Sequence, residues 1–154
     1  MLFTGEFEHA VDAKQRVAIP AEMRGALGES ALFVVIGPNG ALWLWPEKTF
    51  AEIASEIEPS LLPEEDILVF EELLYSQAAR LELDSAGRVR IPERLLGVAE
   101  IDSSTVVLGM RDHIELRNPE KWAERKARVL MADQASIMMR ARQARDARMR
   151  RGRD

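Results

Sequence analysis

The sequence predicts an α+β protein made of two tandem, pseudo-symmetric β units flanked by helices, with a long C-terminal helix. Three observations support this prediction. The stretch DAKQRVAIP at residues 12–20 recurs as DSAGRVRIP at residues 84–92. Apolar and polar residues alternate on both sides of each stretch, which is the pattern of half-buried strands. From Trp122 to about Arg151 the pattern indicates one long helix that becomes rich in arginine.

The repeat extends well beyond nine residues. Shifted by 72 positions, residues 12–37 align with residues 84–109 without a gap, and nine of the 26 positions are identical. Apolar, glycine and proline positions all stay in phase over this length. A short similarity between two segments arises by chance far more easily than one of this length. We therefore interpret the chain as two copies of one supersecondary unit.

Each copy predicts the same series of elements. One strand precedes the motif, a tight reversal lies within it, and a second strand follows. Pro20 and Pro92 suit the first position of a short helix. Two further strands come next, LFVVI and ALWLW in the first copy and TVVLG and HIELR in the second. A helix opened by Pro46 or Pro119 then closes each copy.

A helical insert separates the two copies. We expect one helix over residues 47–58 and a second that begins at Pro63 and keeps a helical stripe of apolar residues, Ile67, Phe70, Leu74 and Ala78. The predicted organisation is a first repeat at residues 5–50, the insert at 51–78, a second repeat at 79–122 and a basic C-terminal helix or tail at 123–154. Because four short strands cannot bury both faces, we expect the two copies to complete each other's sheet.

The charge is unevenly distributed along the chain. Residues 1–122 contain 22 acidic and 11 basic residues, whereas residues 123–154 contain 10 basic and 4 acidic residues. An acidic body with a basic tail is consistent with a polyanionic partner. The arginines of the tail allow two interpretations. They belong either to a solvated helix end that pairs with an acidic neighbour, or to an additional arm that binds phosphates.

Several classes of function receive no support from the sequence. The chain has no cysteine, and His9 and His113 have no carboxylate or histidine at ligand spacing, so we expect no metal site. No nucleophile elbow, phosphate-binding loop or acid–base pair is present, so we expect no enzyme, no cofactor and no small-molecule substrate. The longest apolar run, ALFVVI at 31–36, is too short to span a bilayer, and the first ten residues lack a signal-peptide pattern. We therefore expect a cytoplasmic protein.

The aspartate and arginine of the two motifs carry the chemistry. Asp12 and Asp84 suit a tight turn, because an aspartate carboxylate accepts hydrogen bonds from backbone N–H groups two residues later. A single D-x-x-x-R is most often structural. In two equivalent motifs, however, Arg16 and Arg88 form a repeated cationic feature, with Lys14 beside the first and Arg90 beside the second. Arginine binds phosphates in a bidentate manner and reads guanine in the major groove, which admits a two-stranded ribbon.

These motifs give the chain a resemblance to the MraZ family of bacterial transcriptional regulators, within the SpoVT–AbrB-like group. The resemblance runs from LFTGEFEHAVDAKQRVAIP through LELDSAGRVRIP to VVLGMRDHIELRNPEKW and covers nearly the whole chain. It implies two SpoVT–AbrB-like β units in a double-barrel-like fold, with Asp12, Arg16, Asp84 and Arg88 as motif residues. It also implies homo-oligomeric rings that bind double-stranded DNA at short direct repeats upstream of the cell-division and cell-wall gene cluster, and hence a nucleoid-associated protein.

Two points stay open at the level of sequence. The second motif has Gly87 before its arginine, as the family usually does, but the first has Gln15, which adopts a positive φ only at a cost. We therefore expect the first turn to differ from the second, and Arg16 to point elsewhere than Arg88. The alternative function is a protein-interaction or antitoxin-like assembly module without specific DNA readout, which the acidic body and the helical insert favour.

Overall fold

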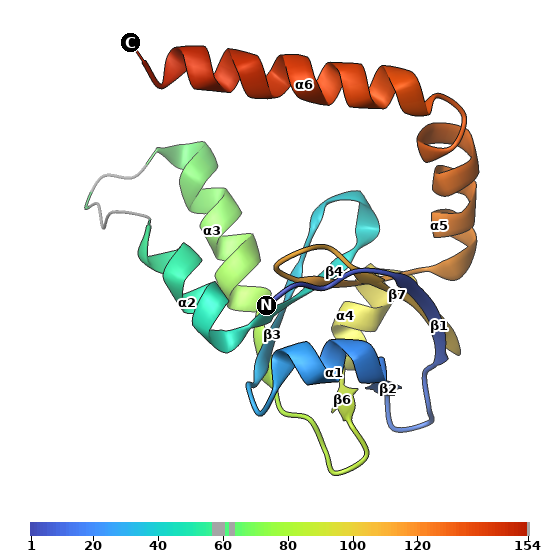
Figure 1. Cartoon of the computed structure of the whole chain (residues 1–154). Coiled ribbons are helices and arrows are strands. Elements are labelled where there is room, and N and C mark those ends of the chain that lie inside the picture. Colours follow the sequence, from blue (N-terminus) through green and yellow to red (C-terminus); the bar gives the residue numbers. More distant parts are fainter. Residues whose placement is uncertain (57–60, 62–63, 154) are drawn as a thin grey trace. The chain divides into compact units, whose positions relative to one another are not determined.

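The computed structural model of the chain describes residues 1–56, 61 and 64–153, and it confirms the α+β class. The chain divides into two compact units, Met1–Pro119 and Glu120–Asp154, which we describe separately. The strands are β1 (Glu6–Ala10), β2 (Arg16–Ala18), β3 (Leu32–Ile36), β4 (Leu42–Pro46), β5 (Ala79–Leu81), β6 (Arg88–Arg90), β7 (Ser104–Gly109) and β8 (Ile114–Arg117) (Figure 1). The helices are α1 (Ala21–Leu27), α2 (Glu47–Ser55), α3 (Glu65–Gln77), α4 (Glu93–Val98), α5 (Pro119–Arg125) and α6 (Gln134–Arg151).

Strands from the two copies pair with each other throughout the first unit. The main sheet is antiparallel with the order β1-β7-β8-β4-β3-β5, and β2 pairs with β6 in a separate two-stranded ribbon. The pairs β1–β7, β3–β5, β4–β8 and β2–β6 each join the first copy to the second. Exchanging β1–β4 for β5–β8 gives the same order read backwards, so the unit has a pseudo-two-fold axis. The expectation that the copies complete each other's sheet is confirmed.

One hydrophobic core lies between the sheet, the ribbon and the two short helices α1 and α4. The fully buried side chains include those of Val17 and Val89 in the ribbon and of Leu44 and Ile114 in the sheet. Leu95 of α4 is also fully buried. Since one core receives the side chains of both copies, the positions of the two motifs relative to each other are fixed by packing.

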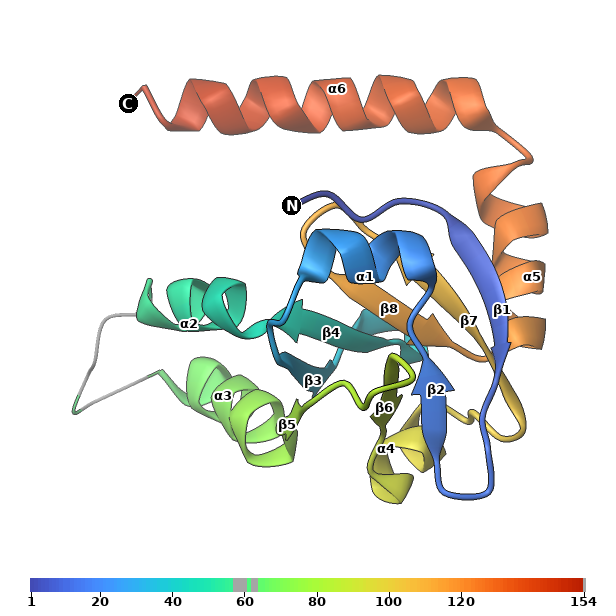
Figure 2. The ribbon, with the colours of Figure 1, turned by 60° about the horizontal axis from the view of Figure 1, so that its bottom comes forward.

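The short helices begin one residue later than the sequence predicts. Pro20 and Pro92 are the residues before α1 and α4, and their ψ angles of 139° and 133° are extended rather than helical. Figure 2 shows α1 leaving one end of the ribbon and α4 leaving the other. This arrangement follows from the antiparallel direction of β2 and β6.

The insert contains two helices, as predicted. α2 follows Pro46, and α3 ends at Gln77; the predicted breaks at Pro59 and Pro63 lie outside the described residues. The apolar stripe of α3 is not buried: the side chains of Ile67 and Phe70 are exposed, and Leu74 is half-buried.

The prediction of one continuous helix from Trp122 to about Arg151 is wrong. α5 is followed by a wider helical turn at Lys126–Leu130, and α6 begins anew at Gln134. Asp133 is non-helical, with φ −148°, and its carboxylate accepts a hydrogen bond from the Ser136 N–H at 3.3 Å. An aspartate in this position satisfies an otherwise unpaired N–H of the first turn, which favours a new helix start. Among the described residues, no helix is long and apolar enough to cross a membrane.

Candidate nucleic-acid interface

The ribbon of β2 and β6 has one buried and one outward face. Its register places Arg16 opposite Arg90, Val17 opposite Val89 and Ala18 opposite Arg88. Side chains alternate between the faces of a strand, and the two valines are fully buried. The outward face therefore carries three arginines, Arg16, Arg88 and Arg90, with Ala18 at the fourth position.

One backbone hydrogen bond at each end of the ribbon joins it to the motif turn of the other copy. The Ile19 N–H donates to the carbonyl oxygen of Gly87, and the Ile91 N–H donates to that of Gln15, both at 2.9 Å. The turn of each motif is thus held by the strand of the other. In Figure 1 the two turns project on the same side of the first unit, at the bottom of the view.

The aspartate of each motif holds its own turn. Oδ1 of Asp12 and of Asp84 each accepts two hydrogen bonds of 2.9 Å, from backbone N–H groups two and four residues later. The bonds from the N–H groups of Arg16 and Arg88 favour the ionised carboxylate. They hold the pKa of both aspartates below the usual value, although desolvation opposes the effect.

The two turns have the same geometry, which contradicts the expected difference at Gln15. The φ angles of Gln15 and Gly87 are 58° and 74°, and both residues lie in the left-handed region. Each donates its N–H to the carbonyl oxygen of the motif aspartate at 3.0 Å. Gln15 therefore adopts a conformation that costs a residue with a side chain about 1–2 kcal/mol.

The motif arginines also contribute to their turns. Nε of Arg16 donates to Oδ2 of Asp12 at 2.7 Å, and Nε of Arg88 donates to Oδ2 of Asp84 at 3.0 Å. Nη1 of Arg88 lies 3.7 Å from Oδ2 of Asp12, so the second motif also contacts the first. These two arginines therefore take part in the structure of the turns as well as in the cationic face. Each pair is about one-third exposed, and such pairs are worth about 1 kcal/mol or less.

Lys14 and Arg90 differ from the motif arginines because they are exposed and have no side-chain partner among the described residues. Arg90 directly faces Arg16 across the ribbon. Since the ladder bonds are made by the neighbouring pairs, Arg16 and Arg90 form a non-hydrogen-bonded pair, in which side chains come closest. Like charges at this spacing destabilise a sheet. The Asp12 carboxylate, 2.7 Å from Nε of Arg16, offsets part of this repulsion, whereas Arg90 has no such partner among the described residues.

Comparison with known proteins gives the family. The model of the family described as "MraZ protein, putative antitoxin-like" matches residues 2–69 and 74–144. The chain belongs to the MraZ family.

Relatives named "Transcriptional regulator MraZ" match most of the chain. The relative from Lactiplantibacillus plantarum is 37% identical over 80% of this chain and 86% of its own length. The relative from Roseiflexus castenholzii is 34% identical over 79% and 84%. The relative from Thermomicrobium roseum is 31% identical over 90% and 96%. The MraZ match thus includes both motif turns and the ribbon.

The side chain of Arg24 of α1 lies beside Gly87 of the second motif and would have to shift if residue 87 had a Cβ. The Nη1 group of Arg24 donates to the carbonyl oxygen of Ala86 at 3.3 Å and crosses the turn beside Gly87. A Cβ on Gly87 would lie 2.1 Å from Nη1 and 2.5 Å from Cδ of Arg24. The position equivalent to Arg24 in the second copy is Leu96, so Gln15 of the first motif does not meet an arginine there.

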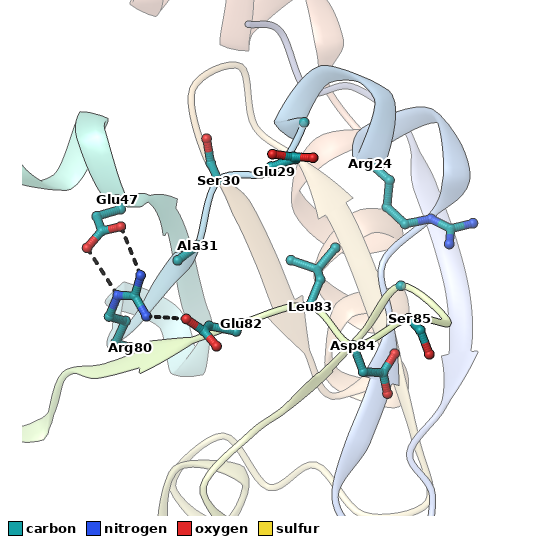
Figure 3. A pocket seen from close by; sticks show the side chains of 12 residues that line it. Arg24, Glu29, Ser30, Ala31, Glu47, Arg80, Glu82, Leu83, Asp84 and Ser85 are labelled. Atoms are coloured by element: carbon teal, nitrogen blue, oxygen red, sulfur yellow. Dashed lines mark hydrogen bonds and ion pairs between the residues drawn. The ribbon is translucent and has the colours of Figure 1, made fainter.

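A cavity beside the second turn is lined by Arg24 and Asp84 and also by Arg80. The guanidinium group of Arg80 is already paired with carboxylates. Figure 3 shows Arg80 between the carboxylates of Glu47 and Glu82, at a distance from Arg24 and Asp84. Arg80 Nε lies 3.1 Å from Glu47, and its Nη1 lies 2.7 Å from Glu82. The hydrogen bond to Glu47, followed by that to Glu82, raises the pKa of Arg80. Arg80 thus links β5 to α2 and does not add to the cationic face.

His113 has carboxylate partners that the sequence analysis missed. Its Nδ1 lies 3.0 Å from Asp112, and its Nε2 lies 2.9 Å from the buried Glu115, while its ring stacks on Trp43 with the centroids 4.1 Å apart. Burial disfavours the charged form of Glu115, but the hydrogen bonds from His113 and Arg117 outweigh it, and the pKa of Glu115 is lowered. Residues two apart on a strand share a face, and this spacing was the missed signal. Within the described residues, no group of three or more histidines, cysteines and carboxylates forms a metal site.

Replacing Gly87 by Ala should destabilise the protein by about 1–3 kcal/mol, because alanine resists the positive φ and its Cβ collides with Arg24. Gly97→Ala is the matched control: a Cβ there meets nothing within 4 Å, and alanine favours α4 by about 0.5–1 kcal/mol. Urea unfolding measures both changes. Adding Arg24→Ala to Gly87→Ala should recover only part of the loss. Equal stability of the Gly87→Ala variant and the parent would contradict this account of the turn.

Proposed function

We propose that this chain is a sequence-specific DNA-binding transcriptional regulator. The observation that carries the proposal is the pair of arginines, Arg16 and Arg90, that face each other on the outward side of the ribbon. Arg16 is paired with Asp12, but Arg90 keeps an exposed charge directly opposite it, and a polyanion that binds over the ribbon would neutralise that charge. The relatives named as MraZ transcriptional regulators support DNA as this polyanion.

The ribbon suits a duplex in two ways. A two-stranded ribbon fits the major groove, where arginine reads the O6 and N7 acceptors of guanine. Lys14 at the first turn is suited to a flanking phosphate. In Arg16 and Arg88 the contact with the aspartate of the same motif uses Nε, which orients the guanidinium group, while Nη1 of Arg88 also lies 3.7 Å from Asp12.

The proposed regulator acts as a homo-oligomeric ring on direct repeats upstream of the division and cell-wall gene cluster. A single ribbon touches few phosphates, whereas a ring presents several ribbons to adjacent repeats. Effective concentration then multiplies the affinity without any new contact. In this proposal residues 5–50 and 79–122 act as the paired repeats, and the protein works in the cytoplasm on the nucleoid.

A second candidate is an antitoxin-like module that binds a protein partner without reading DNA. It is favoured by the description of the family and by the exposed apolar side chains of α3. Purification at low salt distinguishes the two candidates. The DNA-binding function predicts nucleic acid that is released by high salt, and the module predicts a stoichiometric protein that stays bound.

A duplex from upstream of the protein's own gene should bind more tightly than a scrambled duplex of the same length, as measured by fluorescence anisotropy. Affinity should rise with the number of repeats and depend on their spacing. It should also fall steeply with salt, with a slope of about −0.9 for each phosphate contacted. Equal affinity for the two duplexes at moderate salt would contradict sequence-specific regulation.

Arg90→Ala should weaken specific binding by about 1–3 kcal/mol per ribbon engaged and reduce the salt slope. The same change should leave stability equal or higher, because the repulsion with Arg16 is lost. Ala18→Arg should act in the opposite direction, because it places a fourth arginine opposite Arg88. The control is Lys48→Ala, which removes one exposed positive charge from α2 and should leave affinity unchanged. An Arg90→Ala variant with full affinity would remove the ribbon from the interface.

A further inference from the structure

Helix α3 has an outward apolar face. None of the described side chains of this 13-residue helix is buried. Asp66, Val69, Phe70 and Leu73 stand at positions i, i+3, i+4 and i+7, so they share one face, and their neighbour Glu72 is exposed. Val69, Phe70 and Leu73 are 50–54% exposed. A contiguous apolar face of this kind marks an interaction surface.

Helix α6 has a face with the same spacing. Met138, Ala141, Arg142 and Arg145 stand at i, i+3, i+4 and i+7, and together they line a hollow on the helix. The side chain of Met138 is 70% exposed, and Met149, one turn beyond Arg145, is also exposed. Methionine adapts its shape to a partner, so this face combines apolar contact area with positive charge.

The two faces are complementary in charge. The sequence from residue 47 to residue 77 holds nine carboxylates and one lysine, whereas α6 holds six arginines and one aspartate. A contact between two copies of α3 would bring carboxylates together, and one between two copies of α6 would bring arginines together. Only the mixed contact pairs opposite charges while apolar residues meet apolar residues.

We propose that α6 of one subunit docks on the outward face of α3 of a neighbouring copy of this chain. The inference rests on the homo-oligomer of the proposed function and names its interface. A contact between two different surfaces is heterologous, and such contacts close into rings when the rotation between subunits permits. Val69, Phe70 and Leu73 pack against Met138 and Met149, and the carboxylates beside them pair with Arg142 and Arg145.

The interface lies partly outside the family pattern. The family model leaves residues 70–73 and the chain beyond residue 144 unmatched. Phe70 and Leu73 belong to the first of these segments, and Arg145 and Met149 belong to the second. Asp66, Val69, Met138 and Arg142 lie within the matched ranges.

Two charge-reversed variants test the docking by light scattering in the absence of DNA. In the first, Asp66→Arg and Glu72→Arg reverse the face of α3; in the second, Arg142→Glu and Arg145→Glu reverse the face of α6. Each variant alone should fall from the mass of the parent oligomer toward that of a single chain. An equimolar mixture should recover the parent mass, because the unchanged α6 of the first variant fits the unchanged α3 of the second, and the two reversed faces also fit.

Controls make each outcome decisive. The variant with Glu22→Arg and Glu29→Arg has the same change in net charge as the α3 variant and should keep the parent mass. Circular dichroism should give the same helix content for all variants. Single variants that keep the parent mass, or a mixture that does not recover it, overturn the proposal. If the α6 variant keeps its mass but loses affinity for DNA, α6 is a phosphate-binding arm. Because the mass is measured without DNA, failure of DNA binding does not affect this test.

Discussion

The first unit depends on the hydrogen bonds that join the ribbon strands to the opposite turns. The N–H groups of Ile19 and Ile91 are satisfied by the carbonyl oxygens of Gly87 and Gln15, at 2.9 Å in each case. A buried N–H without a partner costs about 1–3 kcal/mol, so neither copy can leave the other without exposing its core and losing these bonds. The duplication is thus one cooperative structure rather than two small domains.

The pairing of the two ribbon strands also produces the cationic face. In an antiparallel pair, each step forward along one strand is a step back along the other. Pairing the buried Val17 with Val89 therefore places Arg16 opposite Arg90. Burial of the two valines in the core stabilises the ribbon and offsets the repulsion between the two arginines. The aspartates complete the arrangement: they shape the turns through backbone bonds and orient the motif arginines. The stability of the turns and the proposed DNA binding therefore rely on the same few residues.

The sequence predicted the local features of the fold and the site, and that the two copies share a sheet, but not which strands pair. Alternation around each motif predicted the strands, and the aspartates predicted the turns, because both effects act over a few residues. The pairing of β2 with β6 joins segments 72 residues apart and follows from a shared core. The same limit explains Gln15, whose unfavourable φ is imposed by the surrounding bonds. The break before α6 did have a local signal in Asp133, which the arginine-rich composition obscured.

Hydrogen–deuterium exchange with and without a duplex bearing the upstream direct repeats tests the central claim most directly. If the outward face of the ribbon is the DNA-binding surface, peptides covering residues 12–18 and 84–90 should exchange more slowly with the repeat duplex than with a scrambled one. This protection should be lost in the Arg90→Ala variant. Protection confined to α6, with unchanged exchange in both motif segments, would contradict the account.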